Sequence, residues 1–147
     1  MNLTERMTDR SRSILAMADR EAWKRAAIAI EPSHLLLALA IEGKGVAANV
    51  LRIRGVNAER IAAELPTALP SVIEPDHPLP LADSMVRAID IARDQCLKLG
   101  HNYIGTEHLI LGVVAVIEQE TPSLLCQLGL SADVILRETY SLLGHLS

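Results

Sequence analysis

Apolar residues recur every three to four positions through much of this 147-residue chain. The clearest stripe contains Ile14, Ala18 and Ala22, with polar and charged residues between them. This spacing puts the apolar side chains on one face of a helix. No segment shows a convincing strict alternation, which is the pattern of a half-buried strand. The pattern therefore predicts an amphipathic helix that begins at a Thr8 or Asp9 cap.

Turn and cap residues divide the remaining sequence into seven further helices. In the first half we expect helices over about 32–42 and 46–54, the latter stopping at Gly55, and a short helix capped by Asn57. In the second half we expect four helices: one capped by Asp83 and ending near Gly100, one capped by Thr106 and ending near Glu118, one opened by Thr121 and Pro122 and stopping at Gly129, and one capped by Ser131 and ending by Gly144. Glycine suits the left-handed position after a helix, which is the role expected of Gly55 and Gly129. The sequence predicts an all-α fold with about eight helices.

The two halves of the chain resemble each other. His34 precedes three leucines, and His108, 74 positions later, precedes Leu-Ile-Leu. The same offset relates nine further pairs without a gap: Asp9/Asp83, Ala18/Ala92, Lys24/Lys98, Ile30/Ile104, Leu51/Leu125, Gly55/Gly129, Ala58/Ala132, Ile61/Ile135 and Glu64/Glu138. A register kept this long indicates a tandem duplication of a four-helix unit that is too small to close its own core. We expect one domain over residues 1–147, with pseudo-twofold symmetry.

Prolines mark the boundary between the two copies. Five of the seven fall between residues 66 and 80, where the missing amide donors and the fixed φ angle prevent a continuous helix. We therefore expect a first repeat over residues 3–65, a Pro-rich linker over 66–81 and a second repeat over 82–146.

Composition and charge exclude several classes of protein. The chain is 50% hydrophobic with a formal net charge of -4, so it lacks the basic surface that binds nucleic acid. The longest apolar run, residues 109–117, is too short to cross a membrane, and the N-terminus has no apolar signal segment. Cys96 and Cys126 have no C-x-x-C partner, which favours buried, reduced thiols. We expect a cytoplasmic protein with no nucleic-acid or membrane partner.

Few residues in the chain indicate chemistry. We expect His34 and His108, each near the start of a Leu-rich helix, to bond neighbouring backbone groups rather than to act in catalysis. The spacing from Glu31 to His34 matches a di-iron ligand pair, but Gly105 stands at the repeated position, so half of such a ligand set is absent. Trp23, the only tryptophan, could anchor a partner or cover the core. The sequence predicts no catalytic residue, no metal and no cofactor.

The segment from Leu99 to Gly112, LGHNYIGTEHLILG, closely resembles the repeat signature of the Clp N-terminal domain family. Segments 8–16, 32–39 and 45–51 are similar to the matching parts of the first repeat. The resemblance implies a pseudo-twofold pair of four-helix repeats that captures adaptors or substrate proteins for a Clp-type AAA+ unfoldase. The 147 residues contain no G-x-x-x-x-G-K-[ST] phosphate loop, so we expect either a stand-alone accessory protein or the N-terminal domain of a longer one.

The resemblance also implies candidate binding residues, because some family members use the Glu of Gly-Thr-Glu-His to bind phosphorylated arginine. A helix N-terminus offers amides to the phosphoryl group, and the adjacent carboxylate accepts from the guanidinium. The second repeat keeps the motif with Thr106 and Glu107, whereas the first has Ser33 in place of the carboxylate. Thr8 of the first repeat is likewise replaced by Ala82 in the second. Any such site is expected to be single and centred on Glu107.

Two functions follow from these observations. The first is a non-catalytic domain that binds adaptors or substrate polypeptides for a Clp-type unfoldase. The alternative is a stand-alone helical regulatory or ligand-sensing scaffold that kept the fold without the unfoldase connection. The altered first motif and the missing phosphate loop motivate this alternative.

Overall fold

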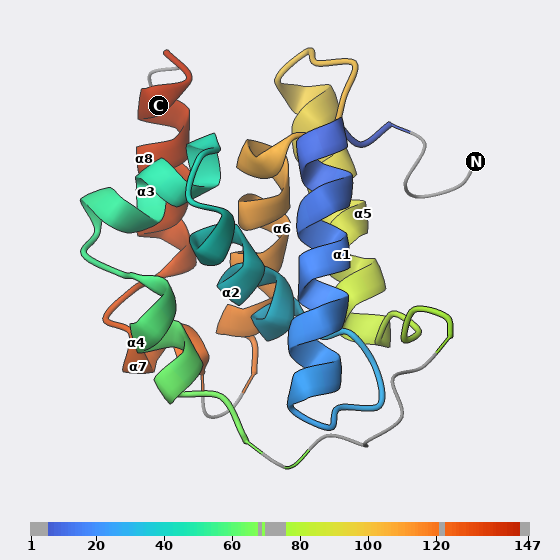
Figure 1. Cartoon of the computed structure of the whole chain (residues 1–147). Helices are drawn as coiled ribbons and strands as arrows, with labels where there is room; N and C mark the ends of the chain where they lie inside the picture. Colours follow the sequence, from blue (N-terminus) through green and yellow to red (C-terminus); the bar gives the residue numbers. More distant parts are fainter. Residues whose placement is uncertain (1–5, 68, 70–75, 121–122, 145–147) are drawn as a thin grey trace.

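The structure, a computed structural model, describes residues 6–67, 69, 76–120 and 123–144, and this part of the chain is all-α (Figure 1). The eight helices are α1 (Asp9–Lys24), α2 (Pro32–Glu42), α3 (Val46–Ile53), α4 (Ala58–Ala63), α5 (Asp83–Lys98), α6 (Thr106–Glu118), α7 (Leu124–Gln127) and α8 (Ala132–Leu142). The predicted fold class and number of helices are confirmed. The predicted start of the seventh helix, at Thr121 and Pro122, lies outside the described residues.

Three of the five predicted N-cap residues are found in the structure. The side chains of Thr8, Asn57 and Ser131 each accept a hydrogen bond from the amide three residues further on, as N-caps do. The predictions of Asp83 and Thr106 as caps were wrong. Ala82 and Gly105 hold those positions without any side-chain bond, because each helix starts one residue earlier than predicted, at the residue that was expected to cap it.

The helices repeat along the chain as the sequence predicted. Three helices of the first repeat (α1–α4) begin 74 residues before their counterparts in the second repeat (α5–α8), at Asp9 and Asp83, Pro32 and Thr106, and Ala58 and Ala132. Gly55 and Gly129 have φ angles of 73° and 74°, the expected left-handed values. The third helices differ, because α7 has four residues where α3 has eight.

Main-chain hydrogen bonds tie the start of the first repeat to the second. The Thr8 N–H donates to the Ile104 carbonyl at 3.1 Å, and the Ile104 N–H donates to the Arg6 carbonyl at 2.7 Å. Between them, Met7 and Ile104 form a single parallel β-bridge. The segment before α1 therefore pairs with the loop between α5 and α6.

The start of the second repeat makes the reciprocal contact. The Ala82 N–H donates to the Ile30 carbonyl at 3.0 Å, and the Ile30 N–H donates to the Pro80 carbonyl at 2.8 Å. Each of these residues lies 74 positions from its counterpart in the first contact. Each repeat thus extends a short segment onto the loop of the other, as a twofold relation requires. We call these two contacts the exchanged segments.

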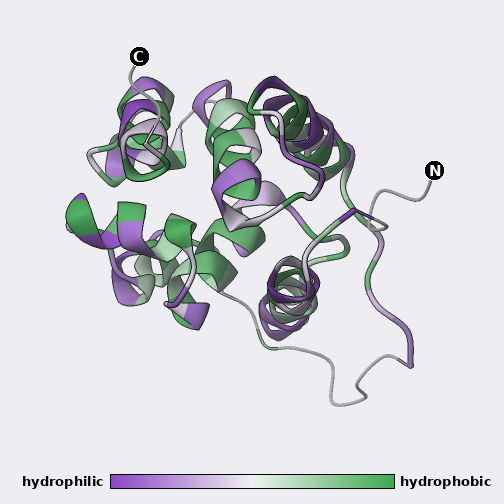
Figure 2. Ribbon diagram, turned by 90° about the horizontal axis from the view of Figure 1, so that it is seen from above, coloured by the Kyte–Doolittle hydropathy of each residue, from purple (hydrophilic) through white to green (hydrophobic). Residues whose placement is uncertain are grey.

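The core lies between the repeats. In Figure 1 the helices α2 and α6 occupy the centre, with α1 and α5 on one side and α3 and α8 on the other. Figure 2 shows the hydrophobic faces of the helices turned inward and the hydrophilic faces outward. Gly112 of α6 packs so closely on α5 that a Cβ there would overlap the Ala88 carbonyl. The central helices are buried as expected, apart from the half-exposed Ile41 near the end of α2.

The structure tests the expectation that both cysteines are buried. Cys96 of α5 is buried, but Cys126 of α7 is exposed, so the prediction that both thiols are buried was wrong for Cys126. A four-residue helix turns its third residue outward here, and its sequence is too short for a periodicity to show this.

No single helix in the described ranges is long and apolar enough to span a bilayer. The pair of α2 and α3 meets that length and composition test only when both helices are taken together, and they are bent by 90° relative to each other.

Ala26 and Gly100 occupy equivalent positions after α1 and α5, and both have positive φ angles, 57° and 73°. A left-handed conformation strains an alanine by about 1–2 kcal/mol, only partly offset by the lower entropy of its unfolded chain. We predict that Ala26→Gly raises the free energy of unfolding by roughly 0.5–1 kcal/mol, and that Gly100→Ala, which meets no steric clash, lowers it by a similar amount. Urea denaturation measures both, and equal stability of all three proteins would contradict the strain at this position.

Candidate functional site

The first turn of α6 holds the predicted Gly-Thr-Glu-His motif. The Gly105 N–H donates to His108 Nδ1 at 2.8 Å, so the imidazole satisfies the amide of the N-cap residue. The hydroxyl of Thr106 is buried and accepts a hydrogen bond of 3.4 Å from the Ala47 N–H of α3. Because the N-cap of α3 is a glycine, Thr106 supplies the capping oxygen from the opposite repeat. Its side chain faces the interior rather than a surface site.

Glu107 follows in the same turn and is only 8% exposed. Its carboxylate folds back over Gly105, and a Cβ at that position would force the end of the Glu107 side chain to move. Within the described part of the chain no hydrogen bond or ion pair reaches this carboxylate. A nearly buried acid at a helix N-terminus is favoured by the helix dipole, and its free oxygens can accept from a cationic donor.

Thr8 joins this motif from the first repeat. It is the N-cap of α1, and its backbone N–H donates to Ile104, one residue before Gly105. Its hydroxyl accepts from the Ser11 amide at 3.1 Å and donates to the Ser11 hydroxyl at 3.0 Å. The N-termini of α1 and α6 are therefore adjacent, and the exchanged segments bring Thr8, Thr106 and Glu107 together.

Ser33 is the first-repeat equivalent of Glu107 and lies near the second exchanged segment. It belongs to the first turn of α2, and the preceding Ile30 is bonded to Ala82 at the start of α5. The twofold exchange thus puts the two retained residues, Thr8 and Glu107, at one site. It puts the two replaced positions, Ser33 and Ala82, at the other. The predicted site residues divide into one complete set and one degraded set.

His101 and Tyr103 complete the surroundings of the motif, although the sequence analysis did not single them out. His101 Nδ1 lies 2.8 Å from His108 Nε2, and the rings of His101 and Tyr103 stack with centroids 5.3 Å apart. The Cys96 thiol donates to the carbonyls of both loop residues, at 3.2 Å and 2.8 Å. Burial raises the pKa of Tyr103, and the Glu107 charge adds to this effect. A comparison of the two repeats could have singled out both rings, because alanines stand at the equivalent positions of the first copy.

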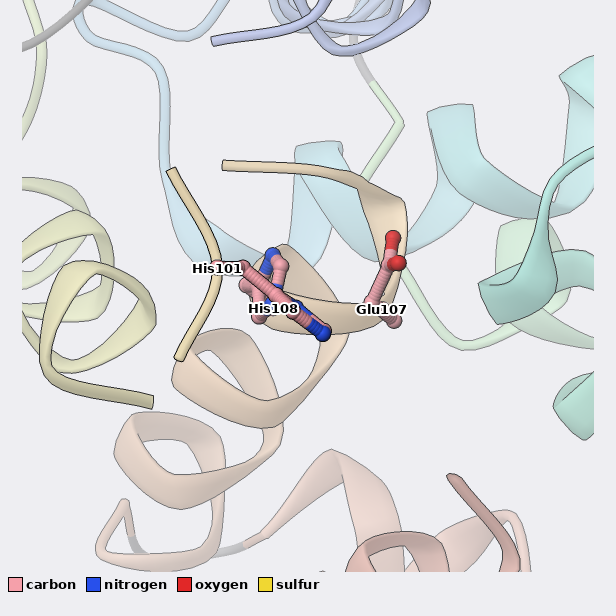
Figure 3. Close-up of side chains that lie close together, drawn as sticks. All are labelled: His101, Glu107 and His108. Carbon is pink, nitrogen blue, oxygen red and sulfur yellow. Dashed lines mark hydrogen bonds between the residues drawn. The ribbon is translucent and has the colours of Figure 1, made fainter. Parts of the chain in front are cut away.

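His101, Glu107 and His108 form a cluster whose potential metal-ligand atoms lie within 4.8 Å of one another (Figure 3). Their hydrogen bonds do not fit a metal ion. His108 Nδ1 accepts from the Gly105 amide, so the single proton of the neutral ring is on Nε2, where it donates to His101 Nδ1. A metal ion held by both rings would need a lone pair on His101 Nδ1 and one on His108. The His108 Nδ1 lone pair is already bonded to the Gly105 amide, and Nε2 carries the proton, which the metal would have to displace. The Gly105 amide, His108 and His101 thus form a hydrogen-bond chain, which Glu107 does not join.

The first repeat keeps only half of that chain. The Glu31 N–H donates to His34 Nδ1 at 2.9 Å, matching His108. Ala27 and Ala29 stand at the positions of His101 and Tyr103, and the described residues give His34 Nε2 no acceptor. The side chain of Arg25 is bonded to Glu21 at 2.8 Å, while its buried Nε has no partner in the structure as described.

The protein families and solved structures that resemble this chain agree on its class. Residues 6–140 match the family described as the Clp repeat (R) N-terminal domain. The chain belongs to the Clp repeat N-terminal domain family. It is 32% identical over 139 residues to the negative regulator of genetic competence ClpC/MecB of Bacillus subtilis, covering 95% of this chain and 17% of that protein.

Two solved structures have the same fold. The Hsp104 N-terminal domain of Candida albicans superposes with a TM-score of 0.77 at 17% identity, over 95% of this chain and 93% of that one. A complex of the ClpV N-domain with a VipB peptide gives a TM-score of 0.71 at 15% identity, over 99% and 91% of the two chains. These likenesses concern the fold alone.

The two buried histidines make stability depend on pH. Burial lowers the pKa of His34 and of His108 to about 4, with smaller contributions from Arg25 and from His101, while an unfolded histidine titrates near 6.5. Between these values the unfolded chain binds more protons. The free energy of unfolding should therefore fall as the pH drops from about 6.5 to about 4, by up to about 1.4 kcal/mol per pH unit for each histidine.

Denaturation curves across this pH range test the assignment. We expect His108→Gln, whose amide oxygen can still accept from Gly105, to reduce the slope by about half. His77→Gln, at a largely exposed histidine, is the control and should leave the slope unchanged. An unchanged slope in His108→Gln would show that His108 does not titrate with folding.

Proposed function

We propose that this chain is a non-catalytic protein-recognition domain that binds adaptors or substrate polypeptides for a Clp-type unfoldase. Membership of the Clp repeat N-terminal domain family supports this role. One solved structure with this fold is a complex of the ClpV N-domain with a VipB peptide, which supports binding of peptides by this fold. The chain spans only 17% of the ClpC/MecB protein that it resembles, so a connection to an unfoldase is part of the proposal.

The observation that carries the proposal is the main-chain bond between Thr8 and Ile104, which brings the start of α1, capped by Thr8, beside the first turn of α6, which holds Glu107. Two helix N-termini meet there, and their dipoles favour an anionic group. Next to them the Glu107 carboxylate has no bonded partner among the described residues and can accept from a guanidinium. A phosphoarginine side chain carries both groups, the anion at its tip and the cation behind it. The same site is therefore suited to proteins marked by arginine phosphorylation.

The degraded set at Ser33 and Ala82 supports a single site. Pro32, which replaces Thr106, has no amide to donate, and Ser33 has no negative charge. The Glu31 charge adds negative potential in this region: burial raises the pKa of Glu120, and the nearby Glu31 raises it further. Negative charge at this position opposes a phosphoryl group. We therefore propose one phosphoarginine per chain.

Calorimetric titration with a phosphoarginine peptide tests this function. We expect one binding site in the wild type. Glu107→Ala should lose about 1.5–3 kcal/mol of binding free energy, roughly a 10- to 150-fold weaker affinity, because the guanidinium loses a charged acceptor. Glu59→Ala is the matched control, since Glu59 is also a first-turn acid but belongs to α4.

The opposite change tests the degraded set. The triple variant Pro32→Thr, Ser33→Glu and Ala82→Thr restores the residues of the complete set, and we expect its stoichiometry to rise from one peptide to two. The same titration with an unphosphorylated arginine peptide should show no binding. Equal affinity of the wild type and Glu107→Ala would remove Glu107 from the site, and no binding of the phosphorylated peptide would overturn the phosphoarginine assignment.

A further inference from the structure

Tyr103 presents an aromatic ring beside the Glu107 carboxylate, and the contacts proposed for phosphoarginine leave this ring unused. The side chain of Tyr103 is 42% exposed, whereas the motif residues that follow it are buried. Gly105 lies between the two side chains: a Cβ on Gly105 would overlap the Glu107 carboxylate and would come within 3.3 Å of Cε2 of Tyr103. Ring and carboxylate therefore border the same small region, in which Glu107 would receive a guanidinium.

The ring of Tyr103 is held in place by its neighbours. It stacks on the His101 ring with an interplanar angle of 3°, and it meets the His108 ring at 66° with centroids 5.7 Å apart. The Cys96 thiol donates to the Tyr103 carbonyl at 2.8 Å. Stacking on His101 covers one face of the ring, so its exposed surface lies on the opposite face and at the edge. Because the ring is already ordered, a ligand that packs on it pays little entropy for fixing a side chain.

A guanidinium is the cation that suits a carboxylate next to an aromatic face. Its edge can donate two N–H groups to the carboxylate of Glu107 while its flat face lies on a ring. It is also less strongly hydrated than an ammonium group, so it loses less hydration free energy when it enters nearly buried surroundings. An aromatic face attracts a cation more strongly when the contact is desolvated in this way. Ring and carboxylate can thus act on one guanidinium together.

The first repeat has neither the carboxylate nor the ring. Ser33 stands at the position of Glu107, and Ala29 stands at the position of Tyr103. A ring that served only to order the loop would be equally useful in both repeats, because both loops lead into the same bond between a histidine and the backbone. The two groups instead occur together in one copy, as expected of two contacts to one ligand.

We propose that Tyr103 is a specificity-determining residue of the phosphoarginine site, where the open face of its ring stacks on the guanidinium that donates to Glu107. The inference rests on the proposed function and adds a contact to the cation, whereas the helix N-termini act on the phosphoryl group. Tyr103 thereby favours phosphoarginine over a phosphorylated side chain that has no planar cation, such as phosphoserine. Phosphoserine offers the site only its anion.

Proton NMR of a phosphoarginine peptide tests the stacking on the wild-type protein itself. The ring current of an aromatic side chain shifts protons that lie above its face to lower frequency. We expect this shift for the δ-methylene protons of phosphoarginine when the peptide binds to the wild type or to Tyr103→Phe, which keeps the ring. The shift should be lost in Tyr103→Leu. Unshifted δ-methylene protons in the peptide bound to the wild type would overturn the inference without any variant.

Calorimetry with the same peptide measures how much the ring contributes. Tyr103→Leu should bind about 2- to 30-fold more weakly, which is the range for a cation on an aromatic face, and Tyr103→Phe should stay within about twofold of the wild type. Asn102→Leu introduces the same side chain at the preceding exposed position of the loop and should leave the affinity unchanged. The inference fails if Tyr103→Leu binds as tightly as the wild type, or if Asn102→Leu weakens binding as much as Tyr103→Leu does.

The outcome for the ring can be separated from that for the site. If Glu107→Ala weakens binding of the phosphoarginine peptide and Tyr103→Leu does not, the ring has no part in binding and the proposed function stands. If the peptide does not bind to the wild type, the proposed function fails and the role of Tyr103 falls with it. The ratio of the affinities for phosphoarginine and phosphoserine peptides should decrease in Tyr103→Leu. An unchanged ratio would show that Tyr103 acts on the loop rather than on the cation, and would also contradict the inference.

Discussion

The mutual pairing of the exchanged segments is the constraint on which the rest of this structure depends. Four main-chain hydrogen bonds of 2.7–3.1 Å attach the start of each repeat to the loop of the other. The central helices α2 and α6 then pack against each other with almost no exposed surface. Neither repeat can complete this arrangement alone, because its loop and its central helix both contact the other repeat. The single core is thus a consequence of the duplication.

This exchange also determines where a binding site can form. A helix N-terminus ends with free amides, and the exchange places two such ends together at each of two equivalent places. Residues that lie far apart in sequence, such as Thr8 and Glu107, become neighbours for this reason. Even the cap of α3 comes from the opposite repeat, through the Thr106 hydroxyl. A site in this fold therefore draws on both copies, and a loss in either copy affects it.

Much of the fold could be predicted from the sequence, because the information is local or repeated. The apolar stripes predicted the helices, and Gly55 and Gly129 marked two of their ends. The constant offset of 74 residues showed how the two halves are related. The caps at Asp83 and Thr106 were wrong because the backbone can begin a helix with no side-chain cap when tertiary contacts hold it. The exposure of Cys126 depends on the packing of a four-residue helix, which no periodicity encodes.

The site was harder to predict, since its geometry comes from the exchange rather than from any one segment. The motif identified Glu107, but only the structure shows that the start of α1, at Thr8, lies beside the start of α6 and that Thr106 faces inward. The sequence also missed a groove between α1 and residues 78–81, a segment of the linker where prolines indicate only the end of a helix. Extended backbone beside an apolar helix face has no periodic signature of its own. The apolar residues Leu79 and Leu81 were the available clue.

The two repeats have diverged in a way that links binding to local stability. In the second repeat Cys96, His101 and Tyr103 hold the loop before α6, and the same rings surround Glu107. In the first repeat Ser33 stands at the position of the carboxylate, alanines stand at the positions of both rings, and Ala26 stands at the position of Gly100. A loop that no longer positions a binding residue needs no such network, and it retains only the His34 bond to the backbone. The intact network around Glu107 is thus the physical reason to expect binding at one repeat and not at the other.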